Sequence, residues 1–251
     1  MIVSMALALI AAAGPERCAQ VSDRKVCLEG PAERGLPLVI YLHGYGGKGD
    51  DDALGLRALA QSQRFLYAAP DAPMNQHDQR DWKTPEVVFL HDLIPKLVAA
   101  GSADAKRVYV AGFSLGGFRA LDLACLRPEG IAAVVSVSGT RLEPAAKCVP
   151  GSVSTLHVHG EEDSTIVPAG GISHRTGLPY LSARAAAGLA AEGAGCKTGL
   201  SPAFGPPGIH VERASGCRDG AVVELWRVPR MGHSSRVPPR ALWDFLKEHS
   251  R

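Results

Sequence analysis

The chain has 251 residues, of which 46% are hydrophobic, and a formal net charge of +2. This length and apolar content suit one globular domain with a large core, and no second domain is required. The charges are spread along the chain without basic runs or interleaved aromatic residues, which argues against nucleic acid as a partner.

The first part of the chain, Met1 to Gly14, is an apolar segment without a charged side chain. It is too short to span a bilayer, but it has the length of a signal-peptide hydrophobic region and ends in an Ala-x-Ala-like site. We therefore expect residues 1–13 to be a signal peptide cleaved after Ala13, and a secreted or periplasmic mature protein without a membrane anchor. The alternative is a buried N-terminal strand or helix, because no Lys or Arg precedes the segment.

Short apolar runs alternate along the chain with longer runs of helical periodicity. The predicted strands are 38–42, 65–69, 107–111, 132–137, 155–159 and 222–228, with an edge hairpin across 20–28. The predicted helices are 52–62, 86–99, 115–126, 181–192 and 239–249. This alternation predicts a single-domain α/β fold with a mainly parallel central sheet and helices on both faces. The connection between 138 and 153 is too short for a large lid domain, so we expect an open cleft.

A glycine-rich loop follows the first fully apolar strand. Residues 38–42 have the composition of a covered parallel strand, and His43-Gly44-Tyr45-Gly46-Gly47 come directly after them. Such a loop can turn the backbone N–H of Tyr45 towards a carbonyl under attack, where the N–H of Leu115 would complete an oxyanion hole. Taken alone, the loop is better explained as a simple strand-to-helix turn, so this interpretation depends on the rest of the site.

The strongest signal is the stretch Gly112-Phe113-Ser114-Leu115-Gly116-Gly117, which lies between a predicted strand and a predicted helix. Glycines two residues before and two after a serine are typical of a sharp strand-to-helix turn that exposes the hydroxyl as a nucleophile. Plain packing and a phosphate-binding turn are the alternatives. A P-loop would need Lys before Ser or Thr at the end of the run, and Phe118-Arg119 stand there instead.

An acid and a base follow the serine in the order that this interpretation needs. Asp163 lies three residues beyond the predicted strand that ends in His157-Val158-His159-Gly160, and His233 follows the last predicted strand. The chain order Ser, Asp, His is that of the α/β-hydrolase triad. All three residues fall at the carboxyl ends of strands, where open α/β sheets carry their sites.

Six cysteines, with no Cys-x-x-Cys pair, favour disulfides in an oxidising compartment over zinc or redox motifs. Connectivity does not follow from the sequence, and we expect sequential pairing. The expected pairs are Cys18 with Cys27, Cys125 with Cys148, and Cys196 with Cys217. The last pair is the best supported, because the Gly- and Pro-rich stretch 197–216 that it closes has little apolar periodicity to order it otherwise.

Three further groups of residues invite a functional interpretation. His157 and His159 share a strand face and could form a metal pair, but a structural role in mid-sheet is the better explanation. The run 50–52 of three aspartates could bind calcium, although acidic residues favour the start of a helix for electrostatic reasons. Trp82 is equally well explained as a substrate-facing wall and as a packing residue.

Taken together, these motifs resemble the secreted polyhydroxybutyrate depolymerase and feruloyl esterase group of α/β-hydrolases, from about residue 20 to the C-terminus. The motifs that carry the resemblance are residues 42–47, Ala69-Pro70-Asp71 with Trp82, residues 112–117, residues 157–163 with Val167-Pro168 and Gly170-Gly171, and Met231-Gly232-His233. The resemblance implies an α/β-hydrolase catalytic domain over residues 14–251. It also implies that Ser114, Asp163 and His233 are the triad of a serine carboxylic ester hydrolase.

The chain departs from the group's pattern at two positions. Ser234-Ser235-Arg236 follow His233 where the group has Trp and Pro, and Tyr45 stands where the group has a small residue or Cys. Neither departure affects the predicted chemistry.

We therefore expect a monomeric, secreted esterase that works through an acyl-enzyme and needs no metal or organic cofactor. Its substrates would be polymer-linked or short-chain esters with feruloyl, acetyl or hydroxyalkanoate groups. A serine peptidase and a non-catalytic binding protein on the same scaffold are the alternatives.

Overall fold

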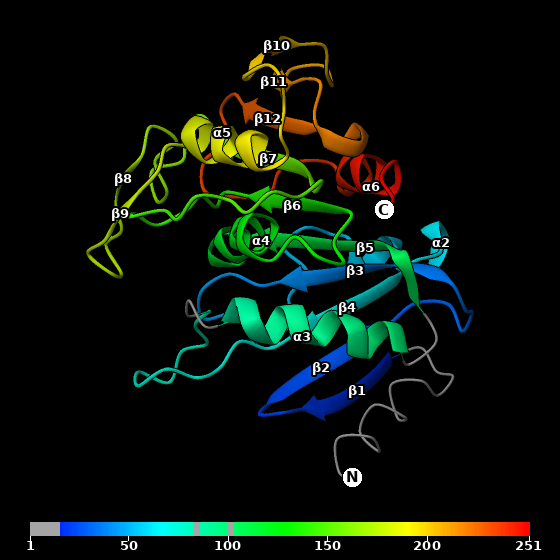
Figure 1. Ribbon diagram of the computed structural model, residues 1–251. Coiled ribbons are helices and arrows are strands. Elements are labelled where there is room, and N and C mark those ends of the chain that lie inside the picture. Colours follow the sequence, from blue (N-terminus) through cyan, green and yellow to red (C-terminus); the bar gives the residue numbers. More distant parts are fainter. Residues whose placement is uncertain (1–15, 83–85, 100–102) are drawn as a thin grey trace.

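The computed structural model describes residues 16–82, 86–99 and 103–251; the predicted signal peptide, residues 1–13, lies outside this part. Ten strands form one sheet in the order β1-β2-β4-β3-β5-β6-β7-β12-β11-β10 (Figure 1). Its strands are β1 (Glu16–Val21), β2 (Arg24–Glu29), β3 (Leu36–Leu42), β4 (Leu66–Pro70), β5 (Ala103–Phe113), β6 (Ala133–Val137), β7 (Ser154–Gly160), β10 (Ser201–Ala203), β11 (His210–Ala214) and β12 (Val223–Val228). A separate small hairpin pairs β8 (Gly171–Ile172) with β9 (Pro179–Tyr180).

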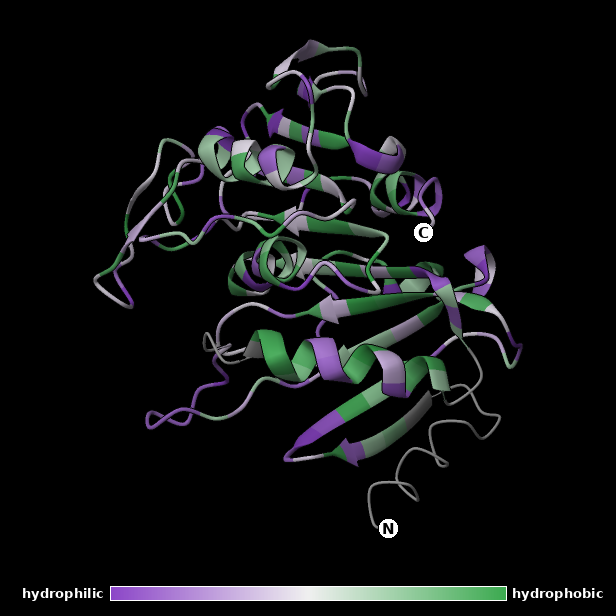
Figure 2. Cartoon of the chain, in the orientation of Figure 1, coloured by the Kyte–Doolittle hydropathy of each residue, from purple (hydrophilic) through white to green (hydrophobic). Residues whose placement is uncertain are grey.

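The central strands β4, β3, β5, β6, β7 and β12 are parallel, and antiparallel strands extend the sheet at both edges. Every residue of β3, β4, β6 and β7 is buried, because helices cover both faces. The hydrophobic residues that permit this burial run along the central strands in Figure 2. The predicted mainly parallel sheet is therefore confirmed.

Alternate residues of each central strand belong to different cores. Leu38, Ile40 and Leu42 of β3 pack with α3 (Glu86–Ala99) and α4 (Leu115–Leu126), whereas Val39 and Tyr41 pack with α2 (Ala60–Gln63) and α6 (Pro239–Lys247). A third cluster lies between α5 (Ala183–Gly193) and β12. This alternation follows from the two-residue period of a strand and explains why both faces are apolar.

Most predicted elements coincide with the observed ones, and the helices 86–99 and 115–126 have the predicted bounds. The predicted helix 52–62 is wrong in its first half. The chain forms turns there, and only a short 3-10 helix, η1 (Arg57–Leu59), and α2 follow. Asp52 still acts as an acceptor for a helix start, since its Oδ2 accepts the N–H of Arg57 at 3.0 Å.

Two hairpins were not predicted, β8 with β9 and β10 with β11. β10 and β11 form a hairpin inside the stretch 197–216, which therefore extends the sheet rather than forming an irregular excursion. A second 3-10 helix, η2 (Arg218–Gly220), follows that hairpin.

Only residues 138–153 connect β6 to β7, in agreement with the absence of a large lid at this point of the chain.

The three disulfides join the pairs that the sequence analysis expected. Cys18 and Cys27 face each other in the β1–β2 hairpin, Cys125 of α4 joins Cys148 in the loop before β7, and Cys196–Cys217 brackets β10 and β11.

Within the described ranges, no helix has both the length and the apolar character that crossing a bilayer requires.

We predict that the double substitution Cys196→Ala with Cys217→Ala lowers the free energy of unfolding by about 3 kcal/mol, because the disulfide closes a loop of the length for which chain entropy gives that value. The two cysteines are 21 residues apart. Urea denaturation would measure the change, and hydrogen exchange should place the lost protection in β10 and β11. An unchanged unfolding free energy would show that the hairpin is held by its strand pairing alone.

Candidate active site

Ser114 lies on a strained turn between β5 and α4. Its backbone has φ 53° and ψ −119°, a conformation that non-glycine residues rarely adopt. The turn is held on both sides, since the N–H of Ser114 donates to the carbonyl of Val137 at 2.8 Å and its own carbonyl accepts the N–H of Phe118 at 3.1 Å. The strain is therefore carried by backbone bonds to the neighbouring strand and helix.

The glycines around Ser114 are required by the close approach of backbone segments. A Cβ on Gly112 would overlap the carbonyl of Gly116, and a Cβ on Gly116 would overlap the carbonyl of Leu42 at the end of β3. The first turn of α4 is thus pressed against two strand ends. Only glycine permits this approach, which explains the spacing that the sequence analysis singled out.

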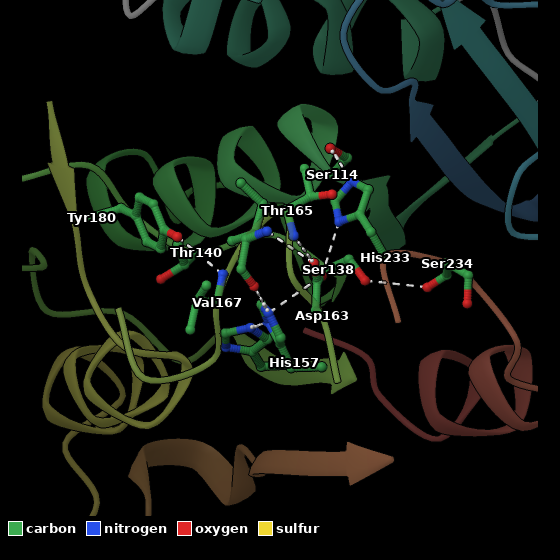
Figure 3. A network of polar contacts seen from close by, with 12 residues as sticks. Ser114, Ser138, Thr140, His157, Asp163, Thr165, Val167, Tyr180, His233 and Ser234 are labelled. Carbon is green, nitrogen blue, oxygen red and sulfur yellow. Dashed lines mark hydrogen bonds and ion pairs between the residues drawn. The ribbon is translucent and has the colours of Figure 1, made fainter. Parts of the chain in front are cut away.

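The structure brings together the three side chains that were predicted as nucleophile, base and acid (Figure 3). His233 Nε2 lies 2.9 Å from Ser114 Oγ, and His233 Nδ1 lies 2.9 Å from Asp163 Oδ2. The three residues come from loops at the carboxyl ends of β5, β7 and β12. With its Nδ1–H donated to the carboxylate, a neutral imidazole presents the Nε2 lone pair to the serine hydroxyl.

Asp163 is built to remain ionised. Its side chain is fully buried, and Oδ1 accepts the N–H groups of Thr165 and Ile166 at 2.9 Å each. Burial acts to raise the pKa of this carboxyl, but the hydrogen bonds from His233 and the Ile166 N–H outweigh it and hold the pKa below its usual value. A carboxylate with its oxygens satisfied in this way keeps His233 in one tautomer and orientation.

The loop that carries His233 is anchored from two sides. Ser138 Oγ donates to the carbonyl of Ser234 at 3.2 Å, and Ser235 Oγ donates to the carbonyl of Ala53. Ser138 itself follows β6 with φ 52°. The serines that stand after His233, where related sequences have Trp and Pro, therefore hold the base by hydrogen bonds to two other loops.

The loop after β3 lies against Ser114. A Cβ on Gly44 would be 3.5 Å from Ser114 Cβ. The buried His43 holds this loop, because its Nδ1–H donates to the Gly44 carbonyl at 2.7 Å while its Nε2 accepts the N–H of Ala72 at 3.0 Å. These two roles require a neutral ring, in agreement with a pKa of His43 that burial lowers.

Tyr45 and Leu115, the predicted oxyanion donors, line one cavity together with Ser114. Leu115 is the first residue of α4, so its N–H has no partner inside the helix. The loop around Tyr45 is closed by other donors, namely Gly46 N–H to the Arg80 carbonyl and Gly47 N–H to the Gly44 carbonyl. Both predicted donors thus belong to the wall beside the serine.

The cavity measures about 410 Å³, a size typical of small-molecule sites. Its lining combines apolar and polar side chains with Tyr45 and Ser114. The apolar residues are Leu115, Phe118, Leu142 and Ile166, and the polar ones are Thr165, Ser173, His174 and Arg175. Because the last three belong to the β8–β9 hairpin, the expected open cleft has a wall that the sequence did not predict.

Trp82 does not line this cavity, which contradicts its prediction as a substrate-facing wall. Its side chain is 1% exposed and belongs to the core, and Nε1 donates to the carbonyl of His43 at 2.8 Å. Trp82 therefore supports the loop of Tyr45 from behind. The sequence could not separate the two roles, because both place a large aromatic ring near the same strand end.

His157 and His159 form a buried chain behind Asp163. His159 Nε2 lies 2.7 Å from the carbonyl of Ile166, which can only accept, so Nε2 carries the proton. His159 Nδ1 then accepts from His157 Nε2 at 3.2 Å. Burial lowers the pKa of both rings, that of His157 to about 3. The pair is a neutral support that fixes the loop holding Asp163, as the structural interpretation of these histidines expected.

The sequence analysis assigned no supporting role to His43 or Ser138. A common signal was available, because each directly follows a strand whose residues are all buried. A polar side chain at such a strand end has few ways to be satisfied, and a neighbouring loop carbonyl is the commonest partner.

Comparison with known proteins agrees with this geometry. Residues 37–169, just over half of the chain, match the family model described as alpha/beta hydrolase fold. The chain therefore belongs to the α/β-hydrolase fold family.

Feruloyl esterase B of Piromyces equi is 28% identical over 172 residues, 66% of this chain and 32% of that protein. Feruloyl esterase D of Neurospora crassa is 27% identical over 210 residues, 76% of this chain and 64% of that protein. The chain thus spans less than two thirds of either relative. The predicted resemblance to the feruloyl esterase group is confirmed.

Among solved structures, an acetyl xylan esterase from Aspergillus awamori superimposes with a TM-score of 0.70 at 12% identity, covering 93% of this chain and 99% of that one. At this identity the likeness shows the fold alone, and it agrees with the predicted fold class.

We predict that the free energy of unfolding falls as the pH drops from about 6 to 4, because the unfolded chain binds protons that the folded chain does not. His43, His157 and His159 have a lowered pKa when folded, whereas an exposed imidazole titrates near 6.5. Each ring that stays neutral contributes a slope of about 1.4 kcal/mol per pH unit. Asp163 contributes in the same direction mainly at the lower end of this window and below it, because its pKa is lowered and the unfolded carboxyl, with its usual value of 3.8, begins to bind protons there.

The matched variant is His157→Gln, which keeps an N–H donor and does not titrate near neutral pH. Urea denaturation at several pH values should show a slope smaller by about one proton in the variant. Equal slopes in the two proteins would show that His157 is protonated in the folded chain.

Proposed function

We propose that this protein is a secreted serine carboxylic ester hydrolase that acts through an acyl-enzyme. The observation that carries the proposal is the continuous line of contacts from Ser114 through His233 to Asp163, both at 2.9 Å. The α/β-hydrolase family and the relatives named esterase support the reaction class.

In the first step His233 Nε2 takes the hydroxyl proton as Ser114 Oγ attacks the ester carbonyl carbon. The carbonyl oxygen becomes an oxyanion, which the N–H groups of Leu115 and Tyr45 stabilise by about 3 kcal/mol per donor. Asp163 stabilises the imidazolium that forms. Collapse of the tetrahedral intermediate breaks the bond to the alcohol, and His233 returns the proton to the departing oxygen.

In the second step water attacks the acyl group on Ser114. His233 accepts a proton from the water, the same oxyanion donors act again, and the serine leaves with that proton as the acid is released. Each step uses the chain's own residues, and the reaction needs no redox change.

The cavity and the relatives support a proposal for the substrate class. A volume of about 410 Å³ lined in part by apolar side chains suits an acyl group of moderate size. A further relative, a Bifunctional acetylxylan esterase/xylanase of Neocallimastix patriciarum, is 26% identical over 132 residues. We therefore place feruloyl, acetyl and hydroxyalkanoate esters, free or linked to a polymer, as the substrates.

Export of a monomeric protein belongs to the same proposal. The apolar residues 1–13 would serve as a signal peptide, and the three disulfides suit an oxidising compartment.

A fluorophosphonate probe tests the mechanism directly. We expect the wild-type protein to be labelled on Ser114, because only an activated serine attacks the phosphorus, and Ser114→Ala to remain unlabelled. The same variant should lose hydrolysis of p-nitrophenyl acetate by roughly 10⁶-fold, as removal of a triad serine does elsewhere. Circular dichroism controls for folding. A folded wild-type protein that resists the probe would contradict the proposal.

A second assay separates the substrate classes. Initial rates would be compared on methyl ferulate, p-nitrophenyl acetate, a polyhydroxybutyrate suspension and a peptide p-nitroanilide. We expect hydrolysis of the esters; activity confined to the peptide would identify a peptidase instead.

A further inference from the structure

The hairpin of β8 and β9 forms one wall of the cavity. The end of the hairpin at Tyr180 is hydrogen-bonded to the loop that follows Asp163. Tyr180 at the end of β9 is buried, and its hydroxyl accepts the N–H of Val167 at 3.0 Å, four residues beyond Asp163. The N–H of Glu143 donates to the carbonyl of Pro179 at 2.8 Å. The end of the hairpin at Tyr180 is therefore attached to the loop that carries Asp163.

The tip of the hairpin, by contrast, is mostly exposed and is attached through one side chain. Arg175 Nη1 lies 2.8 Å from both carboxylate oxygens of Asp81. The other hydrogen bonds that the described chain gives residues 173–178 stay within the hairpin. Arg175 therefore makes the polar contacts that attach this part of the wall to the rest of the described chain.

Arg175 also contacts Tyr45, which lines the same cavity. Its guanidinium carbon lies 4.9 Å from the centroid of the Tyr45 ring, within the range of a cation–π interaction. The Tyr45 hydroxyl accepts from Asn75 Nδ2 at 3.4 Å, and Asn75 and Asp81 belong to one loop. That loop is fixed in turn by the ion pair of Arg80 with Asp71 at 3.0 Å. Three loops distant in sequence thus meet at Tyr45.

We propose that the Arg175–Asp81 pair is a latch that determines specificity, limiting the size of the acyl group that reaches Ser114. This inference rests on the proposed function. With the latch closed, Ser173, His174 and Arg175 of the hairpin tip stay beside Tyr45 in the lining of the cavity. With the latch broken, the tip can move while the end of the hairpin at Tyr180 stays fixed, and longer acyl groups can enter the cavity.

The geometry supports a latch rather than a permanent bond. The side chain of Arg175 is 30% exposed and that of Asp81 is 13% exposed, so water and salt reach the pair. The bifurcated contact of Arg175 Nη1 with both oxygens of the Asp81 carboxylate is a charge-assisted interaction that holds the tip in place while it lasts. An ion pair with this exposure weakens as the salt concentration rises.

The test compares kcat/KM for p-nitrophenyl decanoate with that for p-nitrophenyl acetate. We expect the decanoate-to-acetate ratio to rise about tenfold or more in Arg175→Ala and in Asp81→Ala, the scale on which a few methylene groups are discriminated in an apolar pocket. The change should appear mainly as a lower KM for the decanoate. The double variant should match Arg175→Ala, because without the arginine Asp81 has no contact with the hairpin left to lose.

Two controls make the test specific. Arg184→Ala removes a similar ion pair, 2.9 Å from Glu212 on α5 and β11, and should leave the ratio unchanged. Arg175→Lys keeps the charge but loses the planar guanidinium that lies over the Tyr45 ring, and it should give an intermediate ratio. In the wild-type protein, raising the salt concentration should shift the ratio in the same direction, and it should not do so in the double variant.

The outcomes also separate this inference from the proposed function. If the fluorophosphonate probe labels Ser114 in the variants and the ratio stays at the wild-type value, the latch is wrong and the esterase proposal stands. If the wild-type protein hydrolyses neither ester, the proposed function fails. Should Arg175→Ala not fold, Asp81→Ala, Arg175→Lys and the salt series still decide the question.

Discussion

The close approach of the first turn of α4 to the end of β3 is the constraint on which the site depends. Gly116 touches the carbonyl of Leu42 so closely that no side chain fits between them. This contact forces the preceding Ser114 into a positive φ and brings the loop of His43 and Tyr45 against the serine. A steric condition at one backbone contact thus places the serine hydroxyl and the proposed oxyanion donors together.

Neutral imidazoles then hold the charged part of the site in place. His43 and His159 each donate a ring N–H to a loop carbonyl, which fixes their tautomers, and burial keeps their pKa low. Asp163 is ionised beside them because three donors, His233 and the N–H groups of Thr165 and Ile166, compensate for its burial. Around this buried carboxylate, His43, His157 and His159 are held neutral by burial, which lowers the pKa of each ring, and they support the neighbouring loops.

Local sequence patterns predicted those features that depend on local sterics. The glycine spacing around Ser114, the strand runs and the order of Ser114, Asp163 and His233 each reflect conditions within a few residues or the common edge of a parallel sheet. Trp82, the turns after Asp52 and the β8–β9 wall depend on contacts between segments far apart in the chain. Trp82 is buried because His43 offers its carbonyl there, and no pattern near Trp82 encodes that partner.

The residues proposed to cleave the ester and the wall proposed to select its size are held in place by interactions of different strength. The groups that we assign to bond making sit at the ends of buried strands, where backbone hydrogen bonds and steric contacts leave little freedom. The wall that we assign to size selection is held by a partly exposed ion pair between two surface loops. Tyr45 belongs to both, through its backbone at the serine and its ring under Arg175. Because only the ring meets the latch, substitutions at Arg175 and Asp81 should alter which esters enter before they alter how an ester is cleaved.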